Sequence, residues 1–105
     1  MSEFVPAAKV GDIPEGQAEV FNVDGWPVAV FHVAGEYFAL DDRCPHMGAP
    51  LSLGDVRNGT VICDRHLWAF RLADGVCPET PHLKARTFDV RVRADQIEVR
   101  LPETD

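Results

Sequence analysis

The chain lacks several features that mark common classes of protein. Its 105 residues contain no apolar run long enough to cross a bilayer, so we expect no membrane-spanning segment. Residues 1–6 have neither a basic segment nor an apolar stretch, so we expect no secretory signal and a cytoplasmic location. Basic residues are scarce, with 10 lysines and arginines against 17 acids and a net charge of −7. This balance argues against nucleic acid and membranes as partners.

Helical patterns are absent as well, and short alternating runs take their place. The pattern predicts an all-β protein with strands at residues 4–9, 18–23, 26–33, 37–40, 61–62, 69–72, 88–93 and 97–101. The pair Asp24-Gly25 predicts a tight hairpin, and Pro27 then belongs at the start or on an edge of its strand.

Glycine and proline gather in the middle of the chain, which divides the predicted fold into two parts. We expect a single domain over residues 1–105, with an antiparallel β-sandwich base from residues 1–42 and 82–105. Residues 43–81 would form a small subdomain inserted into that base.

Two short motifs lie in this inserted part. Cys44 and His46 are separated by one residue, Cys63 and His66 by two, and sixteen residues lie between the motifs. Zinc sites more often pair like with like, as C-x₂₋₄-C and H-x₃₋₅-H, so structural zinc is the less favoured alternative. One cysteine and one histidine in each motif suit two chemically different irons, one held by thiolates and one by imidazoles. A disulfide between Cys44 and Cys63 is disfavoured in a reducing cytoplasm.

These motifs, with the order of strands around them, resemble those of Rieske ferredoxins. The run from His66 to Phe70 is especially similar to ferredoxins of toluene and alkene di-iron monooxygenase systems, and the chain more broadly resembles ferredoxins of aromatic-ring dioxygenases. The resemblance implies one [2Fe–2S] cluster. It also implies that Cys44 and Cys63 ligate the buried iron, while His46 and His66 ligate the outer iron near solvent.

The same resemblance implies an electron carrier rather than an enzyme. Such a ferredoxin passes electrons from a flavin-dependent reductase to a terminal oxygenase, as a monomer. The alternative is the small Rieske subunit of an assimilatory nitrite reductase. A Rieske oxygenase would need a further iron site, and only His32 and His82 remain as unused histidines.

Four positions differ from the high-potential members of this family. Ala49 and Arg65 stand where respiratory Rieske proteins carry an additional disulfide, and Trp68 and Phe70 where those proteins place hydroxyl donors to cluster sulfur. Loss of these donors predicts a potential near the low end of the Rieske range, roughly −150 mV.

The remaining residues divide into docking candidates and packing residues. Met47, Leu67, Trp68 and Pro81 are candidates for an apolar docking surface around the histidines, and Pro78 to Pro81 resembles the proline loop that covers the cluster. For Trp68, core packing is an equally weighted alternative. We expect His32 to be a structural histidine, His82 an exposed loop residue and Cys77 a packed residue rather than a ligand.

Overall fold

The computed structural model describes residues 4–23, 25–43, 50–57, 59–62, 69–79 and 84–101. Within these ranges the chain forms β-strands and one short 3₁₀ helix, η1 (Leu51–Leu53). Every strand pair is antiparallel, so the predicted all-β class is confirmed. The strands are β1 (Phe4–Lys9), β2 (Gln17–Val23), β3 (Trp26–Val33), β4 (Glu36–Asp41), β5 (Asp55–Arg57), β6 (Thr60–Ile62), β7 (Ala69–Arg71), β8 (Thr87–Arg93) and β9 (Gln96–Arg100).

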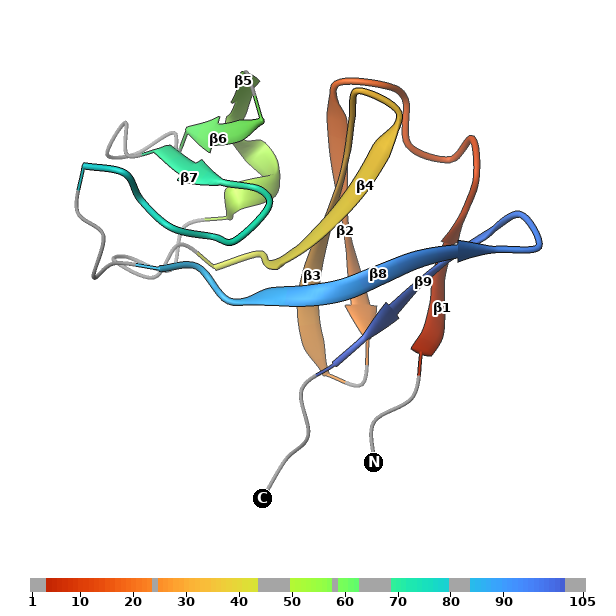
Figure 1. Ribbon diagram of the computed structural model, residues 1–105. Helices are drawn as coiled ribbons and strands as arrows, with labels where there is room; N and C mark the ends of the chain where they lie inside the picture. Colours follow the sequence, from red (N-terminus) through yellow and green to blue (C-terminus); the bar gives the residue numbers. More distant parts are fainter. Residues whose placement is uncertain are drawn as a thin grey trace.

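The larger sheet has the strand order β1-β9-β8-β4-β3-β2 and folds back on itself (Figure 1). Its two halves are joined by a short pairing between β4 and β8, at Ala39 with Phe88 and Leu40 with Thr87. The edge strands β1 and β2 come into contact. A hydrophobic cluster fills the space between the halves: Ile13, Val23, Val28, Val30, Ala39, Phe88, Ile97 and Val99. This part corresponds to the predicted sandwich base.

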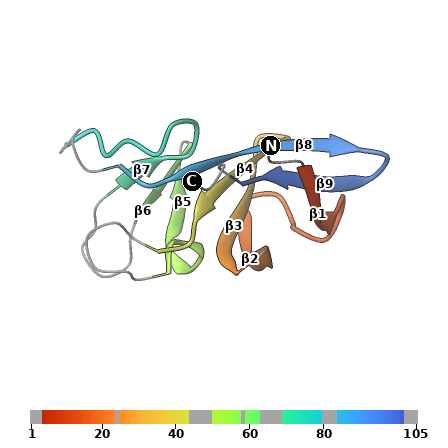
Figure 2. The same cartoon turned by 90° about the horizontal axis from the view of Figure 1, so that it is seen from below.

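The smaller sheet has the order β5-β6-β7 and lies to one side of the base (Figures 1 and 2). Strand β8, together with the residues before it, runs along the length of the molecule from the small sheet to the far end of the base (Figure 2). The small sheet falls within the segment predicted to be a subdomain. The domain boundaries at residues 43 and 81 remain a prediction.

Strand β3 is buried on both faces, which explains why its sequence is apolar almost throughout. Val28 and Val30 point into the core between the two halves of the base. Ala29 and Phe31, on the opposite face, belong to a second cluster that the base shares with the small sheet. An alternating pattern suits a strand with one solvated face, whereas β3 has none.

Two hairpin connections follow β2 and β3. Val23 pairs with Trp26, so residues 24–25 connect β2 to β3, and Pro27 is the second residue of its strand. Between β3 and β4, Ala34 and Gly35 both adopt positive φ, as a type I′ turn requires.

Two elements were not predicted from the sequence. Strand β5 offers only Val56 as an apolar residue between two exposed charged ones, and η1 is a single turn that starts at Leu51. Both lie in the glycine-rich middle of the chain. Strand β5 forms by pairing with β6, and η1 packs against β2 and β3, so tertiary contacts rather than local pattern cause these elements.

Candidate metal centre

Described residues flank segments 44–49, 63–68 and 80–83, which lie outside the described structure. Segment 44–49 lies between Arg43 and Pro50, which form an isolated antiparallel bridge. Segment 63–68 lies between Ile62 and Ala69, which pair across β6 and β7. Segment 80–83 lies within a third connection, whose base is the bridge between Val76 and Lys84. The first two segments hold both predicted Cys/His motifs.

Two consecutive aspartates hold the base of segment 44–49. The Asp42 carbonyl oxygen accepts a hydrogen bond from the Leu51 amide at 2.6 Å, and its carboxylate accepts one from the Ser52 amide at 2.7 Å. The carboxylate of Asp41 instead accepts hydrogen bonds from Arg43, from Nε at 3.0 Å and from Nη2 at 2.9 Å. The bonds to Asp42 connect the residues before the segment to those after it, whereas the bonds to Asp41 orient the Arg43 side chain.

The guanidinium groups of two arginines, Arg43 and Arg86, lie over the ring of Trp26. The guanidinium carbon of Arg43 is 6.0 Å from the ring centroid, and that of Arg86 is 5.2 Å away. Phe88 meets the same ring edge to face, at 5.7 Å between centroids. Hydrogen bonding to Asp41, helped by its negative charge, raises the pKa of Arg43 above its ordinary value, so the guanidinium stays charged. Arg43 is therefore oriented immediately before Cys44 in the chain.

The residues that flank segment 63–68 are paired in the antiparallel strands β6 and β7, and Gly54 lies close to the backbone of β6. Val61 pairs with Phe70 and Ile62 with Ala69, and both Val61 and Phe70 are fully buried. Gly54 lies so close to the backbone of Ile62 that a side chain there would clash with its carbonyl oxygen. The glycine thus permits β5 to start beside the end of β6.

The third connection is held by a turn around Asp74. Its carboxylate accepts hydrogen bonds from Arg71 and, at 3.0 Å, from the Val76 amide. These bonds, with the Arg71 side chain the larger cause, lower the pKa of Asp74 below its ordinary value. Gly75 follows at φ +76°, and its carbonyl accepts a hydrogen bond from the Ala85 amide at 2.8 Å.

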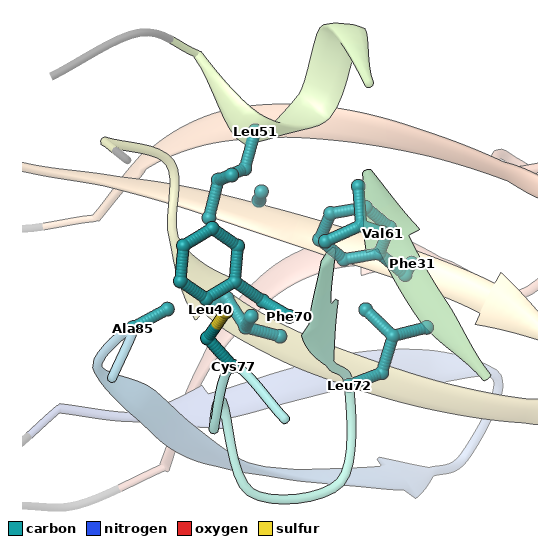
Figure 3. Close-up of a cluster of buried hydrophobic side chains, with 9 residues drawn as sticks. Phe31, Leu40, Leu51, Val61, Phe70, Leu72, Cys77 and Ala85 are labelled. Carbon is teal, nitrogen blue, oxygen red and sulfur yellow. The ribbon is translucent and has the colours of Figure 1, made fainter. Parts of the chain in front are cut away.

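One hydrophobic cluster joins the bases of all three connections. Leu51 follows the first segment, Val61 and Phe70 flank the second, and Cys77 and Ala85 belong to the third (Figure 3). All are buried among Phe31 and Leu40 of the base. Shared packing therefore places described residues next to both Cys/His segments in one small core.

The predicted ligands Cys44, His46, Cys63 and His66 lie outside the described residues. So do Met47, Leu67, Trp68, Pro81 and His82, whereas Pro78 is exposed. The part of the chain that the structure does describe contains no group of three or more potential metal ligands. The two thiols and two imidazoles nevertheless suit a Rieske cluster, since their segments start and end on one core and the donor set matches.

The two other predicted roles agree with the structure. The ring nitrogen Nδ1 of His32 lies 2.8 Å from the Ile13 carbonyl oxygen, and the ring stacks on Tyr37 at 4.4 Å between centroids. His32 is therefore the structural histidine that was expected. Cys77 is fully buried in the shared cluster, as predicted for a packed residue.

Sequence reasoning did not identify the pair Asp41-Asp42, Trp26 or Gly75 as residues that frame the site. The only local signal was the position of the two acids directly before Arg43 and Cys44. Their hydrogen-bond partners include Ser52, Pro27 and Arg86, which are distant in the sequence. Such partners can be found only in the folded chain.

Comparison with known proteins agrees with this arrangement. A model of the Rieske [2Fe-2S] domain matches residues 3–98. The 3-phenylpropionate/cinnamic acid dioxygenase ferredoxin subunit of Escherichia coli (strain K12) is 40% identical over 102 residues, with 92% of each chain covered. The ferredoxin of carbazole 1,9a-dioxygenase from Nocardioides aromaticivorans IC177 superposes with a TM-score of 0.84 and 27% identity, covering 91% of this chain and 95% of that one.

A third match is a structure of reduced oxygenase and oxidized ferredoxin in complex, again from carbazole 1,9a-dioxygenase. Its TM-score is 0.83 at 27% identity, and 92% of each chain is covered. These relatives support the broader of the two predicted resemblances, to ferredoxins of aromatic-ring dioxygenases. The predicted Rieske fold, single [2Fe–2S] cofactor and electron-carrying role are confirmed. The chain is a member of the Rieske [2Fe-2S] domain family.

Proposed function

We propose that this chain is the ferredoxin of an aromatic-ring dioxygenase system and that Cys44, His46, Cys63 and His66 ligate its cluster. The observation that carries the proposal is the common core beneath the two Cys/His segments, in a chain 40% identical to dioxygenase ferredoxin subunits. A Rieske cluster supplies one-electron chemistry when it is bound. Relatives of this kind favour that role over the nitrite reductase alternative.

The four proposed ligands are of two chemical kinds, which would stabilise different oxidation states of iron. The thiolates of Cys44 and Cys63 would bind ferric iron strongly, whereas the neutral imidazoles of His46 and His66 donate less charge. The histidine side is therefore the side at which an added electron is best accommodated. Exposed imidazole edges would give the electron its route to a partner.

The partners follow from the carrier role. A flavin-dependent reductase would donate the electron and a terminal oxygenase would accept it, in the cytoplasm, with this chain acting as a monomer. Within the described residues no helix is long and apolar enough to span a membrane. The aromatic substrate belongs to the oxygenase and not to this chain.

Docking is proposed around the histidines, at Met47, Leu67, Trp68 and Pro81. Pro78 and Glu79, which precede Pro81, are exposed although Cys77 before them is fully buried. The chain therefore turns from core to surface at the start of this proline loop. We expect the contact to be small and short-lived, because a carrier must visit both a reductase and an oxygenase.

The first experiment tests the cofactor and its ligands. The purified protein should contain two irons per chain and show the spectrum of a Rieske cluster. Cys44→Ser and Cys63→Ser should lose it, because an alkoxide is a poor substitute for a thiolate. A colourless protein with stoichiometric zinc, or a normal Rieske spectrum in Cys63→Ser, would contradict the proposal.

The second experiment tests docking in a reconstituted system of reductase, this protein and oxygenase. Trp68→Ala should keep the cluster and its potential but slow electron delivery to the oxygenase, and the rate should depend on salt because exposed charges are screened. Unchanged delivery by Trp68→Ala would assign that side chain to packing.

A midpoint potential near −150 mV is expected for the cluster of the wild-type protein.

A further inference from the structure

Asp42 connects the base of the molecule to the residues that follow segment 44–49. Its amide donates a hydrogen bond to the Pro27 carbonyl oxygen at 2.7 Å, which attaches it to the start of β3. Its carbonyl accepts the Leu51 amide, and its carboxylate oxygen Oδ1 accepts the Ser52 amide at 2.7 Å. One residue thus joins the rigid base of the molecule to the chain on the far side of the segment.

The side chain of Asp42 is buried as well as bonded. The whole residue is 7% exposed, as is Asp41. Asp41 has a cationic partner in Arg43, whereas no ion pair involves Asp42 among the residues that the structure describes. The Ser52 amide is the one hydrogen-bond donor to the Asp42 carboxylate among the described residues. The charge of a buried carboxylate acts strongly on its surroundings, since little solvent screens it.

The position of Asp42 in the chain brings this field close to the proposed ligand Cys44. Two peptide units separate the residues, so their Cα atoms are within about 7 Å of each other. A nearby negative charge disfavours the arrival of an electron by simple repulsion. The Asp42 carboxylate can therefore act in two ways. Its hydrogen bond holds the residues around the segment, and its charge opposes reduction of the cluster.

We propose that Asp42 is a positioning residue for segment 44–49 and that its charge holds the reduction potential of this protein low. The inference rests on the proposed ligand set, because it assigns Cys44 and His46 to the cluster. The hydrogen bond to Ser52 keeps the two ends of the segment at a constant separation. The charge makes the cluster harder to reduce without touching it.

Two variants separate geometry from charge. Asp42→Asn keeps an amide oxygen that can accept the Ser52 bond but removes the charge, whereas Asp42→Ala removes both. Asp55→Asn is the control, since Asp55 is an exposed carboxylate on β5. All three proteins and the wild type are loaded with cluster, and three quantities are measured: the rate of cluster loss, hydrogen exchange at the Ser52 amide and the midpoint potential.

Asp42→Ala should lose its cluster about tenfold faster than the wild type, and the Ser52 amide should exchange faster. The loss of one buried hydrogen bond typically changes such a rate by about this factor. Asp42→Asn should lose cluster and exchange Ser52 at nearly the wild-type rate but have a more positive potential. Asp55→Asn should match the wild type in all three measurements.

Wild-type cluster retention in Asp42→Ala, or a wild-type potential in Asp42→Asn, overturns the proposal. If Asp42→Ala does not fold, Asp42→Asn decides alone, because its potential either rises or stays the same. A wild-type protein without a [2Fe–2S] cluster would instead overturn the proposed function. That result is distinguishable from failure of this inference, which appears only in the variants.

Discussion

At the scale of single residues, Glu15 shows how a loop side chain can stabilise a distant hairpin turn. Its carboxylate accepts hydrogen bonds from the amides of Ala34, at 2.5 Å, and Gly35, at 3.0 Å, in the turn between β3 and β4. His32 Nε2 lies 3.6 Å from the same carboxylate. The amide of Gly35 first and that of Ala34 second hold the pKa of Glu15 below its ordinary value of 4.5.

This lowered pKa predicts a pH dependence with a definite sign. The unfolded chain takes up its proton at higher pH than the folded chain, so stability from Glu15 is present above pH 4.5 and is lost as the pH falls through the folded value. Glu15→Gln should flatten this acid dependence. Thermal unfolding of both proteins between pH 3 and 7 measures it, and parallel curves would show that Glu15 contributes nothing.

Cys77 is a second residue whose role depends on its surroundings. It is fully buried beside Phe70 and Ala85, so its thiol packs as a small apolar group (Figure 3). Cys77→Ser should destabilise the fold by about 1–3 kcal/mol, because it places a hydroxyl among apolar side chains, yet retain two irons per chain. Iron content and urea unfolding measure the two effects. Loss of cluster from a well-folded Cys77→Ser protein would make Cys77 a ligand candidate.

At the scale of elements, two glycines with the same backbone angle allow a matched comparison. Gly59 and Gly75 both have φ of +76°, but a Cβ on Gly59 meets nothing within 4 Å. A Cβ on Gly75 would clash with the carbonyl oxygen of Ala85 across the base of the third connection. The two positions therefore share the strain of a positive φ and differ in steric contact.

Gly59→Ala should cost about 1–2 kcal/mol, the price of a left-handed residue with a side chain. Gly75→Ala should cost more than this, because the backbone bridge to Ala85 must also shift. Urea unfolding of both variants tests the difference. Equal decreases in the free energy of unfolding would mean that the backbone around Ala85 shifts without a further energetic penalty.

The elements themselves were predictable to different degrees. Strands β1 and β3 have the predicted bounds, and β8 and β9 follow their alternating residues closely, because each carries several β-forming side chains in sequence. Strand β5 carries one apolar residue and was missed. Short strands with little pattern of their own form because β6 offers a free edge, and that edge is invisible in the local sequence.

At the scale of the whole molecule, two cores meet on the opposite faces of β3. Phe31 faces the core shared with the small sheet, and its neighbour Val30 faces the core of the base. Both side chains are fully buried. Substitutions at these two adjacent positions of β3 therefore disturb different hydrophobic cores.

Phe31→Ala should destabilise the protein by about 3–5 kcal/mol and accelerate loss of the cluster, because the core beneath both Cys/His segments loses its largest contribution from the base. Val30→Ala should cost about 2 kcal/mol and leave cluster loss nearly unchanged. Unfolding midpoints and the decay of the visible spectrum measure these effects. Equal cluster loss in both variants would show that the two cores act as one.

The amino-acid sequence by itself determined the secondary structure of the base, its hairpin turns and the candidate ligand set. These depend on signals a few residues long: alternation, the Asp24-Gly25 turn and the spacing within each Cys/His motif. Backbone geometry and ligand chemistry act locally, so such signals can be interpreted without the fold.

Only the tertiary structure decided which distant groups meet. It placed the Ser52 amide on the Asp42 carboxylate, the arginines on Trp26 and Cys77 in the core between base and small sheet. These contacts arise because burial brings together side chains from strands far apart in the sequence, and each buried polar group must then find a partner. The pairing depends on the packed whole, so no single stretch of sequence contains it.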